Sequence, residues 1–201
     1  MIDSPSPFLT WLGLCLGLAG GLAISAYTVA NRRARSLGAF RHWLVGWILA
    51  LGGMASMLAG WVLLCLAGPR WESLSARIAG GVICFLSAWI YVQSARLVGR
   101  WRRPSSYTLS LCTRGIHARI RHPQALSLCI LVAGLVLLSG SIPFLVTSPL
   151  WIAFWAGYTV LEERAELIPT FGEEYHRYRK STPRLIPRIR RARSDKGPKP
   201  A

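Results

Sequence analysis

Residues 123–161 carry no charged side chain, although charged residues border this segment on both sides. Arg121 and His122 precede it, and Glu162 and Glu163 follow it. The segment is long enough for two membrane crossings of about 20 residues each, joined by a tight turn. Because two crossings return the chain to the side where it started, we expect the Arg121-His122 corner to face the two glutamates at one membrane surface. Ionisable groups at such a depth are by default a candidate functional site.

The composition of the whole chain agrees with a membrane protein. Of the 201 residues, 52% are hydrophobic and only 16% are charged, and the mean hydropathy is +0.37. Lys and Arg number 24 against 8 Asp and Glu, which gives a formal net charge of +16. These charges lie between and after the apolar runs, and no nucleic-acid recognition motif accompanies them. We therefore expect the basic loops and tail to meet anionic lipid head groups and to set topology, and we expect no nucleic-acid partner.

The apolar runs predict an all-α, polytopic membrane helix bundle of about five transmembrane helices. The predicted crossings are residues 8–30, 43–68, 78–95, about 123–140, and a fifth that begins near Pro149 and ends near Ile168. Ser148 is predicted to cap the fifth helix, and Pro169 is predicted to end it, because proline cannot extend a helix. The last two crossings form a C-terminal helical hairpin, followed by an amphipathic cytoplasmic tail. The predicted divisions are N-terminal crossings 1–104, a functional region 105–187 and a basic, disordered tail 188–201.

The basic residues predict the orientation of the bundle. They concentrate after the first and third crossings and in the tail, namely Arg32, Arg33, Arg35 and Arg41, then Arg96, Arg100, Arg102, Arg103, Arg114, Arg119 and Arg121, then residues 177–199. The loop between the second and third crossings has only Arg70 and Arg77, with Glu72. The positive-inside rule then places the N-terminus outside and the C-terminus in the cytoplasm. Asp3 precedes the first run in place of a basic segment, so we expect no cleavable signal peptide and a bacterial inner membrane location.

We interpret the cysteines and glycines of the apolar runs as packing residues. Four of the five cysteines fall inside apolar runs, and no CxxC or CxxH spacing occurs. We expect buried thiols, and neither a disulfide framework nor a metal site. The glycines of the first two runs are expected to allow close helix packing in lipid.

The Arg-His-Pro corner suits an anionic group. Pro123 at a helix start leaves free backbone N–H groups and the positive end of the helix dipole, and Arg121 and His122 add side-chain donors. A cofactor carboxylate or phosphate would bind well there. The alternative is that Arg121 is a boundary arginine and that His122 only caps the helix.

The two glutamates need a positively charged partner, whereas the Arg-His-Pro corner suits a negatively charged one. Carboxylates near a helix C-terminus oppose the helix dipole at a cost of about 0.3–1 kcal/mol, so a cation should offset them. Arg164, Arg121 or a ligand with an amine or a sulfonium beside an adenosine ribose would do so. The alternative is a solvated helix end with Glu162, Glu163 and Glu166 on its wet face.

Four motif blocks follow one another in the C-terminal half of the chain. They are residues 111–117 leading into Arg121-His122-Pro123, then Glu162-Glu163, then residues 171–175 with Tyr178, and finally residues 184–187. In this order they resemble the isoprenylcysteine carboxyl methyltransferase and phospholipid methyltransferase superfamily of membrane enzymes. The resemblance covers residues 111–187, and the first three crossings carry no motif of their own.

The resemblance implies an S-adenosylmethionine-dependent methyltransferase whose lipophilic acceptor enters from the bilayer. By position it assigns cofactor binding to His122, Pro123 and Glu163, with Gly115 and Glu162 as further cofactor-binding candidates, and action at the methyl acceptor to Arg121 and Tyr175. Methyl transfer from a sulfonium needs in-line positioning and exclusion of water more than a strong acid or base. The absence of a catalytic triad or metal motif is therefore no objection.

Three positions depart from the family pattern. The family usually continues Arg-His-Pro with x-Tyr-x-Gly, where this chain has residues 124–127 with Ala125 and Ser127 at those places. The family's tyrosine two residues after the preceding glycine is here His117. Counted back from residues 171–172, the second family glutamate falls on Arg164, so Glu162 is a candidate by its place beside Glu163 and not by alignment.

These departures leave two other functions open. One is an NADPH-dependent reductase of the related sterol and steroid reductase type, which usually carries an asparagine-tyrosine pair and a glycine-glutamate where this chain has residues 124–125 and 127–128. The other is a catalytically silent membrane protein that keeps the fold. Among acceptors, a prenylated protein carboxylate, a phospholipid amine, a thiol and a hydroxyl all remain open.

Overall fold

The computed structural model describes residues 7–37, 40–101 and 110–187. Within these residues the chain is helical, with the elements α1 (Pro7–Leu37), α2 (Phe40–Leu66), α3 (Leu74–Trp101), the short 3₁₀ helix η1 (Gly115–Ala118), α4 (Pro123–Ser139), α5 (Ile142–Glu162), the π-helix η2 (Glu163–Leu167) and α6 (Ile168–Ser181). The predicted tail 188–201, with Arg102 and Arg103, lies outside the described residues, as do the side chains of Arg32, Arg33, Arg35, Arg41 and Arg100.

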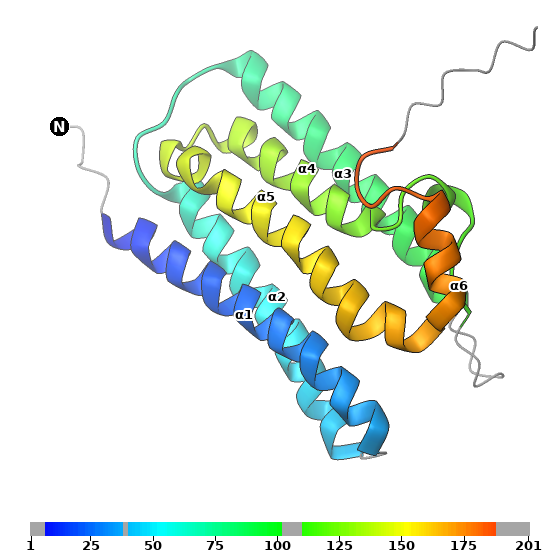
Figure 1. Cartoon of the computed structure of the whole chain (residues 1–201). Helices are drawn as coiled ribbons and strands as arrows, with labels where there is room; N and C mark the ends of the chain where they lie inside the picture. Colours follow the sequence, from blue (N-terminus) through cyan, green and yellow to red (C-terminus); the bar gives the residue numbers. More distant parts are fainter. Residues whose placement is uncertain (1–6, 38–39, 102–109, 188–201) are drawn as a thin grey trace, which may run out of the picture.

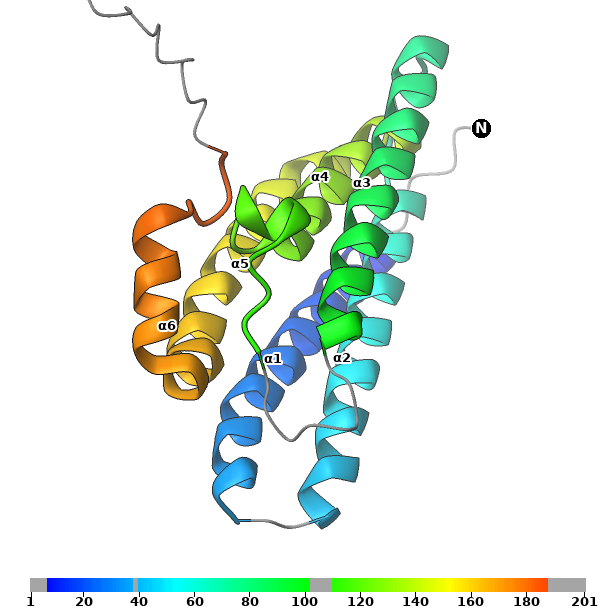
Figure 2. The ribbon, with the colours of Figure 1, turned by 90° about the vertical axis from the view of Figure 1, so that its right-hand side faces the viewer.

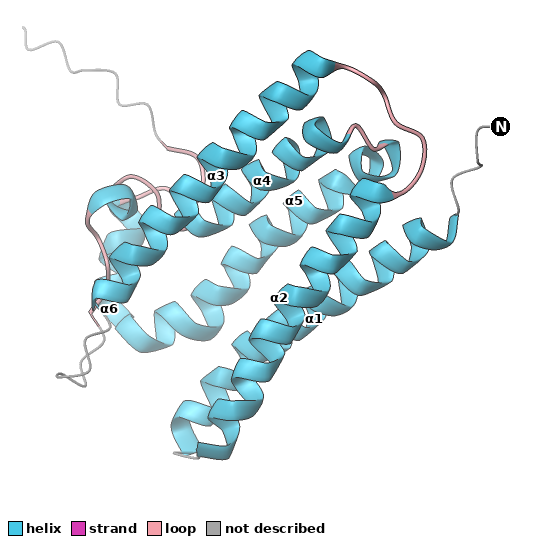
Figure 3. Cartoon of the chain, turned by 180° about the vertical axis from the view of Figure 1, so that it is seen from behind, coloured by secondary structure: helices cyan, strands magenta, loops and turns pink. Residues whose placement is uncertain are grey.

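The helices form two antiparallel pairs with α5 between them (Figures 1 and 3). The helices α1 and α2 pack on each other, α3 and α4 pack on each other, and α5 contacts both pairs. Four helical segments are long and apolar enough to cross a membrane, at Pro7–Ala30, Ile48–Leu66, Leu74–Val98 and within Ile142–Ser181, and Pro123–Ser139 is a shorter apolar helix. The predicted all-α membrane helix bundle is thus confirmed.

The reversal between α4 and α5 is fixed by the loop that joins α2 to α3. Gly140 takes a left-handed conformation with φ of 66°, which a side chain would strain. Ser141 Oγ donates to the carbonyl oxygen of Leu64 at 2.6 Å, and the amide of Trp71 donates to the carbonyl of Gly140 at 3.1 Å. The chain therefore turns back at residues 140–141, as the uncharged segment predicts, and returns Glu162 to the side where α4 begins.

The predicted start of the fifth crossing at Pro149 is wrong. The helix α5 begins at Ile142, and its N-cap is Ser141, whose side chain accepts from the amide of Phe144 at 3.3 Å. Pro149 lies inside the helix, where it removes the amide that would bond to the carbonyl of Leu145. The hydroxyl of Ser148 donates to that carbonyl at 2.8 Å instead. A serine beside the proline thus satisfies the freed backbone group, which is what allows proline inside a membrane helix.

The predicted helix end before Pro169 is also wrong. The π-helix η2 follows α5 directly, and the amide of Ile168 donates to the carbonyl of Glu163. Pro169 occupies the first turn of α6, where a missing N–H costs nothing. The chain bends three residues later at Gly172, whose φ of 49° and ψ of −125° are not helical. Figure 2 shows α6 turned back beside the end of α5.

Glycines bring α1 and α2 into backbone contact, as predicted. A Cβ atom on Gly20 would lie 2.4 Å from the carbonyl oxygen of Gly53, and one on Gly60 would lie 2.5 Å from that of Gly13. Such distances are excluded for real side chains, so only glycine permits this approach. Gly52 has open space around it and is not part of this contact.

Candidate functional site at the end of the α4–α5 hairpin

His122 bridges the two glutamates across the hairpin. Its Nδ1 lies 3.1 Å from Glu162 Oε2, and its Nε2 lies 3.0 Å from Glu163 Oε1. His122 immediately precedes α4, Glu162 ends α5, and Glu163 begins η2. Because both ring nitrogens face carboxylate oxygens, an imidazolium that donates twice fits this geometry best. The expectation that the Arg-His-Pro corner meets the glutamates is confirmed, and His122 makes no side-chain capping bond.

Glu163 is the centre of a buried charge cluster. Its side chain is 2% exposed, and Arg121 Nη1 lies 2.8 Å from Oε1 as an ion pair. Arg184 adds a second guanidinium, with Nη2 at 3.1 Å from Oε2 and Nε at 3.3 Å from Oε1. Buried carboxylates are stable only when paired in this way. For Glu163 the alternative of a solvated helix end is therefore wrong.

Sequence reasoning missed the role of Arg184. The residue stood in the last motif block, but no pattern assigned it a partner. In the structure the amides of Arg121 and His122 also donate to the carbonyls of Pro183 and Arg184, at 2.9 and 3.1 Å. The segment after α6 thus holds the start of α4 through backbone bonds and holds Glu163 through the Arg184 side chain. The block at residues 184–187 was the signal that could have indicated this contact.

A cavity of about 340 Å³ opens beside this cluster, and its two ends differ in chemistry. Its lining includes the polar Arg121, His122, Glu162, Glu166 and Tyr175 and the apolar Ile24, Met54, Ala125, Leu128 and Trp155. Trp155 lies about two turns before Glu162 on α5, and Leu128 nearly two turns beyond His122 on α4, so we call the two groups the polar and the apolar end. Its volume lies in the range of sites for small molecules and cofactors. Glu166 is a second carboxylate in the wall, a residue that the sequence analysis named only in the alternative of a solvated helix end.

A π-helix forms the cavity wall between Glu162 and Glu166, two residues that are four apart and would share one face of a regular α-helix as well. Its wider turn follows Glu162 directly and contains Glu166. Single π-turns inside α-helices are rare and often occur at functional sites. A regular helical periodicity, which is what a sequence pattern assumes, does not predict this insertion.

Two buried donors at the polar end have no partner among the described residues. They are the Nε of Arg121 and the hydroxyl of Tyr175. Tyr175 is 1% exposed, and the Arg121 side chain is 7% exposed. Leaving such groups unsatisfied costs about 1–3 kcal/mol each. Both residues line the cavity, but the two atoms have almost no accessible surface, so a small side-chain movement would have to present them to a ligand oxygen.

The predicted site residues do not all line the cavity. Arg121, His122, Pro123, Glu162 and Tyr175 do. Glu163 is not among the lining residues, and it contacts the cavity through Arg121 and His122. Gly115 does not line it either: its φ is +60°, and a Cβ there would lie 2.8 Å from Leu97 Cδ1, so it serves a turn packed on α3.

His117 anchors the loop that carries Gly115. Its Nε2 lies 3.0 Å from Ser94 Oγ on α3, and its carbonyl accepts a short hydrogen bond from the Tyr178 hydroxyl. Burial lowers the pKa of His117 from its ordinary value, so its imidazole is neutral near pH 7. The residue that replaces a family tyrosine thus joins α3, the loop and α6 at the cavity wall.

The pKa of His122 predicts a pH-dependent stability. Burial lowers this pKa, but the hydrogen bonds and charges of Glu162 and Glu163 outweigh burial and raise it above the ordinary value. Because the pKa of His122 is higher in the folded state, protonated His122 stabilises the folded protein fully below the unfolded-state pKa. This stabilisation is lost as pH rises through the folded-state pKa.

As pH rises from the unfolded-state pKa of His122 through its folded-state pKa, we expect the unfolding temperature of the solubilised wild-type protein to fall. The fall should be larger than that of the His122→Gln variant over the same pH range. Thermal unfolding from about pH 6 upward measures the difference between the two proteins. His176→Gln on α6 is the matched control and should follow the wild type. Parallel curves for wild type and His122→Gln would contradict the ionic role of His122.

The sequence profile described as phospholipid methyltransferase matches residues 75–174, from the start of α3 into α6. Protein-S-isoprenylcysteine O-methyltransferase of Schizosaccharomyces pombe is 35% identical over 81 residues, which cover 39% of this chain and 34% of that protein. The chain thus spans about a third of the length of this curated relative. No solved structure matches. Residues 75–174 are therefore a domain of the phospholipid methyltransferase family, in the superfamily that the sequence motifs resembled.

Proposed function

We propose that this protein is a membrane methyltransferase that transfers the methyl group of S-adenosylmethionine to a lipophilic acceptor. The observation that carries the proposal is one cavity with a charged end and an apolar end, inside a domain of this family. A polar cofactor and a hydrophobic acceptor need such a pair of environments next to each other. The S. pombe relative is named for an isoprenylcysteine acceptor, so prenylated cysteine is the first acceptor to test.

The polar end has the groups that the cofactor needs. Glu162 and Glu166 supply carboxylates for an amine and for ribose hydroxyls, and His122 holds Glu162 in place. The cofactor supplies an electrophilic methyl group on a sulfonium. Phe171 and Leu167 add apolar wall to this end of the cavity. The residues therefore fit S-adenosylmethionine.

The chain's own residues would act by positioning and by excluding water. Arg121 and Tyr175 line the cavity, and a small movement would turn the Arg121 Nε and the Tyr175 hydroxyl toward an oxygen of the acceptor, which would orient the attacking atom. Tyr175 and Tyr178 are buried and, with the segment after α6, cover the site. In the overall reaction the acceptor atom would form a bond to the methyl carbon and the carbon–sulfur bond would break, so that the sulfonium leaves as a neutral thioether. A carboxylate acceptor has no proton to lose, whereas an amine, thiol or hydroxyl acceptor would release its proton to water.

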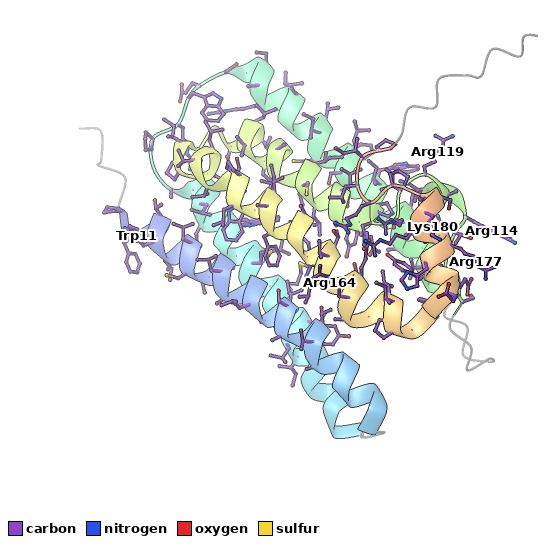
Figure 4. All side chains as sticks on the ribbon, viewed as in Figure 1. Trp11, Arg114, Arg119, Arg164, Arg177 and Lys180 are labelled. Atoms are coloured by element: carbon purple, nitrogen blue, oxygen red, sulfur yellow. The ribbon has the colours of Figure 1, made fainter. Side chains whose placement is uncertain are left out.

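We also propose that the polar end faces the cytoplasm. The labelled side chains of Arg114, Arg119, Arg177 and Lys180 gather at the end of the molecule beside α6, and Trp11 lies at the opposite end (Figure 4). Basic residues concentrate on the cytoplasmic side of membrane proteins, where they also meet anionic head groups. The N-terminus of α1 would then be outside.

The test is methyl transfer by the purified protein in lipid nanodiscs. S-adenosylmethionine labelled in the methyl group is added with total membrane lipid extract, or with S-farnesylcysteine. We expect label in a lipid-soluble product and binding of the cofactor by calorimetry. Cofactor binding without transfer to any lipid would favour a silent protein, and binding of NADPH in its place would favour the reductase; either result contradicts the proposal.

A further inference from the structure

The apolar end of the cavity is built partly by helices outside the family domain. Ile24 on α1 and Met54 on α2 line it, and both precede the matched residues 75–174. Ile24 is only 5% exposed. The helices that carried no sequence motif thus complete the wall of the site.

Side chains close to these two are exposed on the surface of the bundle instead. Leu22 on α1 is 72% exposed, and Leu51 on α2 is 62% exposed. In a membrane bundle such side chains contact lipid. Ile24 and Met54 have apolar surface that faces the cavity instead, so α1 and α2 each present one side chain to the site and a neighbouring one to the bilayer.

A hydrogen bond fixes α1 against the cavity wall of α5. Thr28 Oγ1 donates to the carbonyl of Ile24 at 3.1 Å and lies 2.8 Å from the Tyr158 hydroxyl. Thr28 is 1% exposed, and Tyr158 lines the cavity. Gly17 brings α1 still closer to α5, because a Cβ there would lie 2.4 Å from the ring of Trp151. The position of Ile24 in the wall is therefore set by specific contacts and not by chance packing.

The rest of the apolar lining belongs to the family domain. It includes Ala125 and Leu128 on α4 and Trp155 on α5. Ala125 is one helical turn beyond His122, so the apolar chamber joins the charged end directly. A molecule with a reactive head at the charged end would place its hydrocarbon between these residues and Ile24 with Met54.

We propose that Ile24 and Met54 determine which acceptor this protein takes, by contacting its hydrocarbon portion in the chamber. The inference rests on the proposed function and adds that the selectivity of the site lies in α1 and α2. Head-group chemistry stays with α4, η2 and α6. Shape complementarity to the hydrocarbon comes from helices that lie outside the family domain.

The first experiment compares acceptors of different hydrocarbon length in nanodiscs. S-geranyl-, S-farnesyl- and S-geranylgeranylcysteine are tested with Ile24→Ala and Met54→Ala, and with the lipid-facing controls Leu22→Ala and Leu51→Ala. We expect each cavity variant to raise KM for the preferred acceptor about tenfold and to shift the preference toward a longer chain, because several apolar carbons are removed from the contact. The dissociation constant of S-adenosylmethionine and kcat should change little, and the controls should behave as wild type.

A second measurement does not depend on turnover. S-farnesylcysteine with a diazirine in its prenyl chain is irradiated with the wild-type protein, and labelled peptides are identified. Labelling at residues 24 and 54 that unlabelled S-farnesylcysteine competes away supports the inference. Competed labelling confined to residues 75–174 overturns it.

The two proposals fail in different ways. A wild-type protein that transfers methyl groups, with variants that keep the wild-type KM and chain preference, would leave the methyltransferase standing and reject α1 and α2 as its selectivity element. A protein that binds no S-adenosylmethionine would reject the methyltransferase, whereas competed labelling at residues 24 and 54 would still show the chamber to be a hydrocarbon site.

Discussion

Glu163→Gln is expected to lower the free energy of unfolding by about 3 kcal/mol or more and to abolish measurable S-adenosylmethionine binding. The carboxylate is 2% exposed and pairs with Arg121, His122 and Arg184. Removing one member of a buried ionic cluster leaves the others uncompensated, at a cost of about 3–5 kcal/mol. Arg121 and His122 would also lose the contact that orients them toward the cavity. Denaturant unfolding and calorimetric titration measure the two effects.

Glu173→Gln is the matched control for this change. Glu173 lies on α6 and is exposed, so the same loss of charge should leave both stability and binding near those of the wild type. Glu162→Gln should give an intermediate result, since Glu162 is 32% exposed and its ion pair in the described part of the chain is with His122. A Glu163→Gln variant with wild-type unfolding and binding would show that the buried cluster does not support the site.

Arg121→Lys is expected to reduce the rate of methyl transfer about 100-fold while cofactor binding falls much less. Lysine keeps a positive charge near Glu163 but lacks the Nε–H, which in Arg121 is buried without a protein partner. The loss of one positioned donor to a reacting group typically costs a factor of about 100 to 1,000 in rate. Single-turnover kinetics with S-farnesylcysteine, or with the acceptor found in lipid extract, separates this rate from binding.

Arg119→Lys provides the comparison for Arg121→Lys. Arg119 is exposed in the same loop and lies outside the cavity lining. The Arg119→Lys variant should therefore transfer methyl groups at the rate of the wild type. Equal effects of both changes would indicate that the loop needs arginine for reasons unrelated to the acceptor. An unchanged rate in Arg121→Lys would remove Arg121 from the acceptor site.

The hairpin and its charged ends could be predicted because they follow from the solvent. A bilayer excludes charges, so an uncharged segment of this length must span and return. That argument alone brought His122 to Glu162 and Glu163, and the structure has both contacts. It needed no information on side-chain packing.

Local proline rules failed at Pro149 and Pro169, because the helical path continues through both residues. Pro149 was predicted to begin a helix, but the Ser148 hydroxyl bonds to the carbonyl that the proline leaves free. Pro169 was predicted to end a helix, but η2 ends there and α6 begins. At Pro149 the sequence showed the missing N–H and did not show that the Ser148 hydroxyl would compensate for it; at Pro169 it did not show that a new helix would begin at Ile168.

The sequence by itself determined that this is a membrane protein, that its last two crossings form a hairpin, and that His122 meets Glu162 and Glu163 where the hairpin begins and ends. It could do so because hydrophobic length and charge act on each segment separately. Only the tertiary structure decided that Glu163 lies behind the cavity, that Arg184 returns to bind it, and that α1 and α2 close the apolar chamber. These features depend on contacts between segments far apart in the chain. No local pattern encodes such contacts, because close glycine packing, the π-turn and buried charge pairing produce them together.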